Sequence, residues 1–309
     1  MGNEKLSILL NPSAGTGKAL RKKGELEERL QQSGIPYDLT VTQSAENLRG
    51  LTRQHAKRYG AIVGAGGDST FHIMVNEIVA AGADVNFGMI AVGSSNDIAK
   101  EFGVDTLEKA CLALKTMRIK KIDLGGIYDE GKLTRCFLGQ ANIGVGVFVN
   151  QHVAELAQRK PESAEHQTWA GIRGILRAYR DKKIPLTLAV GFEGDQVDGE
   201  FVAAVVSNVR YWATGKIINP EAKPDDGWLD TCLIKDCSFL RLARISWLAK
   251  TGKHGKAKEV NILRSQNFEI SSPRPFMIQA DGEILGGPDQ APLRKAMFRV
   301  LPRALNIIC

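Results

Sequence analysis

An apolar segment that runs into glycines and then into a helical pattern constrains this chain more than any other feature. Residues 61–71 read Ala-Ile-Val-Gly-Ala-Gly-Gly-Asp-Ser-Thr-Phe. The pattern predicts a buried strand, a glycine turn and a helix that begins near Thr70. Glycines let a ligand approach bare N–H groups, and a helix N-terminus favours negative charge. The segment therefore predicts a phosphate site with the carboxylate of Asp68 beside it, as in a phosphate-handling enzyme.

Predicted strands alternate with predicted helices through the first 120 residues. This alternation predicts a mainly parallel sheet whose ligand edge lies at the carboxyl ends of the strands. From about residue 122, short strands with glycine-rich turns predict a β-rich second domain, interrupted by helical inserts at 151–180 and 238–251. The strands of the first domain are expected at 6–10, 36–42, 61–63 and 87–92, and its helices at 19–32, 45–59, 70–81, 94–102 and 106–116.

Composition narrows the class of protein. The chain of 309 residues carries a net charge of +7, which favours an anionic partner, although a surface that is merely basic explains the charge equally well. No apolar run approaches the roughly 18 residues of a membrane-spanning helix. The five cysteines form no Cys-x-x-Cys pair, which argues against zinc and favours reduced thiols in a cytoplasmic protein.

Two further loops follow predicted strands of the first domain. Residues 11–15 read Asn-Pro-Ser-Ala-Gly and resemble the start of a P-loop, but Pro12 replaces a required glycine. Residues 93–97 read Gly-Ser-Ser-Asn-Asp and offer hydroxyl and amide groups at a helix start. Alone, each is explained as well by an ordinary turn or a helix cap. The functional interpretation rests on the fact that both loops share the predicted ligand edge with residues 64–70.

Two acidic segments in the second half of the chain can each be interpreted either as an ordinary turn or as part of a functional site. Residues 223–230 read Lys-Pro-Asp-Asp-Gly-Trp-Leu-Asp and form either a turn or a cation site of one carboxylate and backbone carbonyls. Residues 281–283 read Asp-Gly-Glu and form either a hairpin turn or the position of a general base. Taken alone, the turn is the favoured interpretation of each.

Residues 239–258 combine apolar and basic side chains. The pattern predicts either an amphipathic helix on an anionic membrane surface or a helix that packs on its own domain with a solvated basic edge. The basic residues are Arg241, Arg244, Lys250, Lys253, Lys256 and Lys258.

Taken together and in this order, the loops resemble the diacylglycerol kinase catalytic-domain family, which includes bacterial lipid kinases and sphingosine kinases. The family pattern resembles Asn-Pro-x-x-Gly, Gly-Gly-Asp-Gly-Thr, Gly-Thr-x-Asn-Asp, Asp-Asp-Gly-x-Leu-Asp and Asp-Gly-Glu. Its counterparts here are residues 11–15, 66–70, 93–97, 225–230 and 281–283. Each motif alone is weak, but five in register span nearly the whole chain.

The resemblance implies an α/β nucleotide-binding domain of residues 1–122 with a return of 291–309, and a β-sandwich lipid-substrate domain of residues 123–290. It implies ATP, Mg²⁺ and transfer of the γ-phosphoryl group to a lipid hydroxyl, on diacylglycerol or a related lipid. It implies Asp281 as the base, with Glu283 nearby and Asp68 as the competing candidate. A structural Mg²⁺ would sit on the Asp226 side chain and the carbonyls of Lys223 and Trp228. The implied nucleotide contacts are Asn11, Pro12, Ser13, Ala14, Gly15, Thr42, Gly66, Gly67, Asp68, Ser69, Thr70, Phe71, His72, Ser94, Asn96 and Asp97.

The chain departs from the family pattern at a few positions. Ser69 replaces a glycine, at a cost of about 1–2 kcal/mol if the position needs a positive φ. Ser94 replaces a threonine and keeps the hydroxyl, whereas His72 and Ile73 stand where the family often has Asn-Glu. These changes put rate and substrate choice in question more than fold.

Two rival functions stay open. One is an NAD kinase, which shares the Gly-Gly-Asp element, and the other is a lipid- or nucleotide-binding regulator that has lost activity. For the favoured lipid kinase we expect a cytoplasmic protein that associates peripherally with the inner face of the cell membrane, where its lipid substrate lies. We expect no nucleic-acid partner and leave a homodimer open.

Overall fold

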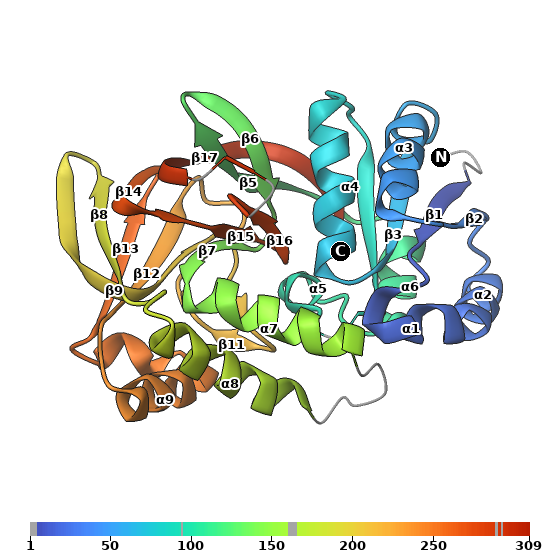
Figure 1. Cartoon of the computed structure of the whole chain (residues 1–309). Coiled ribbons are helices and arrows are strands. Elements are labelled where there is room, and N and C mark those ends of the chain that lie inside the picture. The colour runs from blue at the N-terminus through green and yellow to red at the C-terminus, as the bar shows by residue number, and fades with distance from the viewer. Residues whose placement is uncertain (1–4, 94, 160–165, 288–289, 292) are drawn as a thin grey trace.

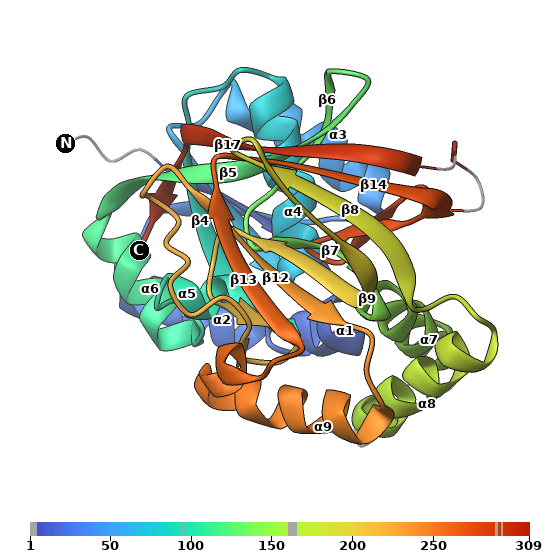
Figure 2. The same ribbon diagram turned by 90° about the vertical axis from the view of Figure 1, so that its left-hand side faces the viewer.

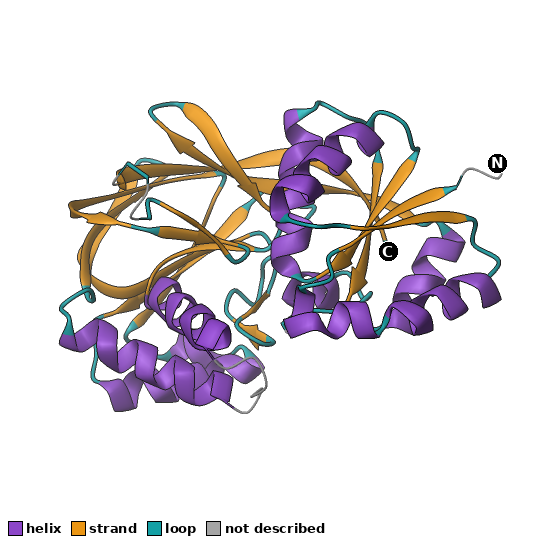
Figure 3. Cartoon of the chain, turned by 45° about the vertical axis from the view of Figure 1, so that its right-hand side comes forward, coloured by secondary structure: helices purple, strands orange, loops and turns teal. Residues whose placement is uncertain are grey.

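Parallel strands and the helices between them form the first part of the chain, as the alternating pattern predicts. The computed structural model describes residues 5–93, 95–159, 166–287, 290–291 and 293–309. Helices cover both faces of the fan of strands, as Figure 3 shows. The elements are β1 (Leu6–Leu10), α1 (Ala14–Arg21), α2 (Lys23–Gln32), β2 (Tyr37–Val41), α3 (Ala45–Ala56), β3 (Ala61–Gly66), α4 (Asp68–Ala80), β4 (Asn86–Ala91), α5 (Asp97–Glu101) and α6 (Leu107–Thr116).

The strand register brings three strand ends to one edge of this sheet. Leu10 of β1 pairs with Ala65 of β3, and Gly66 of β3 pairs with Ala91 of β4. The loops that follow these strands therefore start side by side at the carboxyl edge, where open α/β sheets bind ligands. β1 and β3 are buried along their whole length and consist almost entirely of apolar residues, as expected for strands whose two faces are both covered by helices.

Antiparallel strands form the rest of the chain, and their helices gather at one end of it (Figure 1 and Figure 2). The predicted insert at 151–180 appears as two helices, of which the first begins earlier, at Val145. The elements are β5 (Ile119–Asp129), β6 (Lys132–Phe137), β7 (Gln140–Gly144), α7 (Val145–Arg159), α8 (His166–Arg180), β8 (Leu186–Phe192), β9 (Asp195–Ser207), β10 (Tyr211–Trp212), β11 (Lys216–Ile217), β12 (Leu229–Lys235), α9 (Phe239–Leu248), the 3₁₀ turns η1 (Ala249–Thr251) and η2 (Lys253–Lys256), β13 (Val260–Ser265), β14 (Asn267–Phe276), β15 (Ile278–Ala280), β16 (Glu283–Leu285) and β17 (Leu293–Ile308).

Two long strands, β5 and β17, connect the parallel and antiparallel parts. They pair antiparallel with each other, and β17 also pairs with β14 near its start and with β4 near its end. Ile122 at the start of β5 packs in the core of the parallel part, whereas Ile127 packs in the core of the antiparallel part. The predicted domain boundary at residues 122 and 123 therefore falls inside a strand that serves both cores, and that division stays a prediction.

The first helical region differs from the sequence pattern. One helix is expected at 19–32, but α1 starts earlier, at Ala14, and ends at Arg21, where α2 follows after a single residue. None of the helices that the structure describes is both long enough and apolar enough to span a bilayer.

Candidate active site

Glycine-rich loops meet at the edge where β1, β3 and β4 end. The carbonyl of Gly66 accepts hydrogen bonds from the N–H groups of Val92 at 2.9 Å and Gly93 at 3.1 Å. Beyond them, a Cβ atom on Gly93 would lie only 2.5 Å from the Cα atom of Gly67. Because real Cβ atoms do not approach backbone so closely, position 93 requires glycine. The two loops thus form one backbone surface with little side-chain cover.

Asn11 ties the loop after β1 to the start of α4. Its side-chain N–H group donates to Thr70 Oγ1 at 2.9 Å, and its Oδ1 accepts from the Ser13 N–H group at 3.1 Å. Its backbone N–H group donates to the carbonyl of Ala65 at 2.9 Å. Residues 12–15 are left partly or fully exposed at the same edge. The predicted loops after β1 and β3 are therefore neighbours in space.

A left-handed stretch interrupts α1 close to this edge. Gly15, Thr16 and Gly17 have φ values of 60°, 55° and 81°. This conformation costs a β-branched residue such as threonine about 1–2 kcal/mol, and observed outliers of this kind cluster at ligand sites. Gly15 also lies so close to the loop after β4 that a Cβ atom would be 2.7 Å from the Val92 carbonyl oxygen. Sequence reasoning placed the glycines in a loop but missed Thr16.

Some of the implied nucleotide contacts are buried. The side chains of Phe71 and His72 are completely buried, so they offer a nucleotide no surface, contrary to the expectation. Thr42 is also buried, and its hydroxyl donates to the carbonyl of Leu10 at 3.2 Å. Ser94 lies outside the described residues.

Ser69 lies in the first turn of α4 and does not have a positive φ. The backbone strain that serine would cause at a position with a positive φ is therefore absent at Ser69. Its hydroxyl faces the turn between β15 and β16, since a Cβ atom on Gly282 would lie 2.5 Å from Ser69 Oγ. Gly282 has a φ of 106°, so a side chain there would be both strained and crowded.

Asp68 links the loop after β3 to the N-terminus of α5. Its two carboxylate oxygens accept from the N–H groups of Asp97 at 3.2 Å and Ile98 at 3.3 Å. Burial, together with the nearby carboxylates of Asp97 and Asp281, raises the pKa of Asp68 to about 7. A carboxyl group with such a pKa can both accept and release a proton near neutral pH.

Asp97 reaches from α5 to the turn between β10 and β11. Its Oδ2 accepts from the Thr214 N–H group at 3.0 Å and its Oδ1 from the Gly215 N–H group at 2.7 Å. The Ser95 hydroxyl adds a hydrogen bond of 2.8 Å, yet burial still raises the pKa of Asp97. The sequence analysis did not include this turn in the site. The glycine at 215 is the one feature of the sequence that indicates a turn there. The contact fixes the antiparallel part of the chain beside the glycine loops.

Asp281 occupies a two-residue hairpin turn between β15 and β16, with a φ of 48°. Its carboxylate accepts hydrogen bonds from three consecutive backbone N–H groups, those of Leu138 at 2.7 Å, Gly139 at 2.9 Å and Gln140 at 3.0 Å. His72 Nδ1 lies 3.3 Å from the same carboxylate. The Asp281 side chain has no exposed surface. The predicted hairpin is present, and its aspartate is saturated with donors from the protein.

The other two acidic residues predicted to be functional, Glu283 and Asp226, lie in different environments. Glu283 begins β16 and is partly exposed. Asp226 forms an ion pair with Arg264 and accepts from the Trp228 N–H group at 3.1 Å, as in an ordinary turn. Within the described part of the chain, no group of three or more His, Cys, Asp or Glu side chains is arranged to hold a metal ion. The cation site of Lys223, Asp226 and Trp228 therefore stays a prediction.

Two family profiles match the chain. The family described as diacylglycerol kinase catalytic domain matches residues 5–127, and the one described as YegS C-terminal NAD kinase β-sandwich-like domain matches residues 139–309. The second profile alone covers more than half of the chain. The fold class is thus as predicted, an α/β domain followed by a β-sandwich domain.

Individual relatives agree with the profiles. A diacylglycerol kinase of Mycobacterium tuberculosis is 27% identical, over 98% of this chain and 94% of the relative. A Pseudomonas aeruginosa protein named "probable lipid kinase YegS-like" is 26% identical, over 90% of this chain and 86% of the relative. The crystal structure of a Bacillus anthracis diacylglycerol kinase shares the fold with a TM-score of 0.70 at 17% identity, over 99% of this chain and 96% of that one. The chain therefore belongs to the family described by the YegS C-terminal NAD kinase β-sandwich-like domain, and its first part matches the diacylglycerol kinase catalytic domain.

Proposed function

We propose that this protein is an ATP-dependent kinase that transfers the γ-phosphoryl group to the hydroxyl of a lipid, diacylglycerol or a close relative of it. The observation that carries the proposal is the convergence of the glycine loops after β1, β3 and β4 on Asp68, at the junction with the β-sandwich domain. Phosphoryl transfer needs positioning, charge neutralisation and a group that takes the hydroxyl proton, and this junction offers groups suited to each.

The residues at the edge fit a nucleotide. The backbone around Gly67 and Gly93 is free of Cβ atoms, and the N-terminus of α4 favours phosphate oxygens. Asn96 Oδ1 is buried without a hydrogen-bond partner among the described residues, which suits an acceptor that waits for a donor from a ligand. ATP with a divalent cation, Mg²⁺ in our proposal, would supply the phosphoryl group and neutralise its charge.

The contacts support Asp68 ahead of Asp281 as the proton acceptor. Asp68 is partly exposed at the glycine loops, and its pKa of about 7 leaves a large ionised fraction at neutral pH. Asp281 has no surface to offer a substrate, and three N–H donors already occupy its oxygens. We therefore assign Asp281 a positioning role, in which it holds residues 138–140 and His72 beside the hairpin.

The test is transfer of label from [γ-³²P]ATP to a panel of acceptors. The panel contains an extracted lipid mixture, pure diacylglycerol, a sphingoid base and NAD, and it is run with the wild type and with Asp68→Asn. We expect label on a lipid with the wild type and almost none with the variant. Label on NAD alone would establish the rival NAD kinase. ATP binding without label on any acceptor would establish the regulator.

A further inference from the structure

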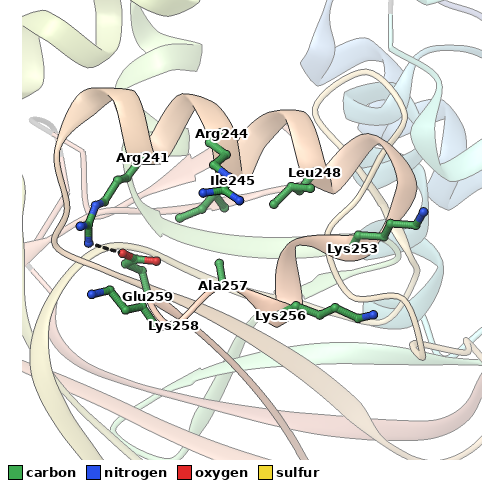
Figure 4. Close-up of a pocket in the computed structure, with 9 residues that line it drawn as sticks. All are labelled: Arg241, Arg244, Ile245, Leu248, Lys253, Lys256, Ala257, Lys258 and Glu259. Carbon is green, nitrogen blue, oxygen red and sulfur yellow. Dashed lines mark hydrogen bonds and ion pairs between the residues drawn. The ribbon is translucent and has the colours of Figure 1, made fainter.

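A basic groove lies between α9 and the segment that follows it (Figure 4). Its volume is about 520 Å³, and its walls come from the helix on one side and from residues 253–259 on the other. Five cationic side chains line it against a single carboxylate, that of Glu259. Glu259 is already paired with Arg241 at 2.6 Å. The remaining cations are Arg244, Lys253, Lys256 and Lys258.

These four cations lack partners within the protein. All four residues are exposed, and among the residues that the structure describes no carboxylate lies within ion-pair distance of any of them. A concentration of unpaired positive charge in a concave site attracts anions, and an array of this kind suits several phosphate groups better than one.

Two large apolar side chains are exposed on the outer face of α9. Leu240 and Trp247 are 80% and 66% exposed, and their spacing of seven residues puts them on one side of the helix. Leu242 and Ile245 are buried on the opposite side, so the helix is already anchored to its own domain. The exposed leucine and tryptophan are therefore not needed for the fold. Tryptophan favours the boundary between water and hydrocarbon.

We propose that the outer face of α9 and the basic groove beside it dock on a bilayer that contains anionic phospholipids. Trp247 and Leu240 enter the interface, while the four unpaired cations contact lipid phosphates. His254 follows Lys253 of the groove, and its Nε2 lies 2.8 Å from the carbonyl of Ile218, next to β11. The adjoining turn between β10 and β11 is the one that binds Asp97. Docking does not depend on the proposed function, because vesicle binding needs no turnover.

The experiment measures vesicle binding by sedimentation. The full-length protein is mixed with phosphatidylcholine vesicles, with or without about one-third phosphatidylglycerol, at about 0.1 M salt. We expect tight binding only with phosphatidylglycerol. Each cation near such a surface contributes roughly fivefold in affinity, so replacing all four with glutamine should weaken binding by about 100-fold after screening. Trp247→Ala should weaken it by about tenfold.

Matched controls separate docking from net charge. One control variant replaces with glutamine four exposed cations outside the groove that have no ion-pair partner in the described part of the chain, Lys57, Lys115, Arg118 and Lys132. Another is Leu112→Ala, which removes a side chain that is 61% exposed on α6. Both controls should bind vesicles as the wild type does.

Several outcomes would overturn the inference. They are wild-type binding by the groove variant, an equal loss in both fourfold variants, and binding to an RNA oligonucleotide as tight as binding to the vesicles. Circular dichroism melting of each variant guards against misfolding. If the groove variant melts early, the double variant Arg244→Gln, Lys256→Gln is tested in its place, with about a tenfold loss expected after screening.

Discussion

The N–H group of Gly215 donates a hydrogen bond to Asp97 Oδ1 at 2.7 Å, across the junction between the α/β and β-sandwich domains. The contact places a turn of one domain directly over the start of α5 in the other. Arg210 strengthens it through an ion pair of 3.1 Å with Glu101 at the other end of α5. These polar contacts hold α5 against the turn between β10 and β11, in addition to the long strands β5 and β17 that run through both domains.

Asp97→Asn should destabilise the protein by about 1–3 kcal/mol, because one carboxylate oxygen is replaced by an N–H donor that faces other donors. Urea unfolding followed by circular dichroism measures the change. Asp105→Asn is the control, since Asp105 is paired only with Lys109 near the surface and should cost less than about 1 kcal/mol. Equal stability of Asp97→Asn and the wild type would show that the junction does not depend on this contact.

Gly67→Val should abolish ATP binding and leave the fold intact. Gly67 has an extended backbone that valine adopts easily, but the branched side chain would fill the space beside Gly93. Calorimetry with a non-hydrolysable ATP analogue measures the effect. Gly50→Val makes the same change on α3, where a Cβ atom would meet nothing within 4 Å, and should bind normally. Normal binding by a folded Gly67→Val protein would remove this loop from the nucleotide site.

The two candidate bases should respond differently to the same change. Asp68→Asn should lower kcat by about 10²–10⁴, as for a lost acid–base group, and this loss should exceed what any decrease in stability from its two backbone hydrogen bonds explains. Asp281→Asn should instead lower the free energy of unfolding by about 2–4 kcal/mol, because its new N–H group would face the N–H groups of residues 138–140. Parallel kinetics and urea unfolding distinguish the two. A fully stable Asp281→Asn protein that lacks turnover would make Asp281 the base.

Asp68 should make the protein less stable as the pH rises. Its folded-state pKa of about 7 lies above the ordinary value of 3.8, so its protonated form favours the folded state. That stabilisation is complete below about pH 4 and is lost as the pH rises through 7, with a slope of up to about 1.4 kcal/mol per pH unit. Urea unfolding between about pH 5 and pH 8 in EDTA compares the wild type with Asp68→Asn. The variant should show the shallower dependence, and identical slopes would contradict the raised pKa.

The predicted cation site can be tested through stability. Asp226→Ala should lower the Tm and abolish any increase that Mg²⁺ causes, because a cation that binds only the folded state stabilises it. Arg264→Ala is the matched control, since it breaks the ion pair of Asp226 but keeps the carboxylate. It should retain the Mg²⁺-dependent shift. If Mg²⁺ raised the Tm of the wild type and of Asp226→Ala equally, residues 223–230 would be an ordinary turn and not a cation site.

Local chemistry made much of the fold predictable. The strand expected at 61–63 and the helix expected at 70–81 are present as β3 and α4, although β3 extends to Gly66 and α4 begins two residues early, because apolar strands, glycines and helix starts depend on neighbouring residues. The Asp-Gly turn at 281–282 is equally local, since a type I′ hairpin turn requires a positive φ at both positions, which both residues have here. Helix boundaries were less predictable, as the early start of α1 at Ala14 shows.

The sequence by itself determined the order of strands and helices, the glycine loops and their placement at one edge of a parallel sheet. Only the tertiary structure decided which side chains can reach a ligand. Phe71 follows the glycine loop in sequence but lies in the core, and Asp281 is surrounded by donors from residues 138–140, more than 140 positions away. Burial and carboxylate saturation arise from contacts between distant segments. Periodicity and spacing along the chain carry no information about such contacts.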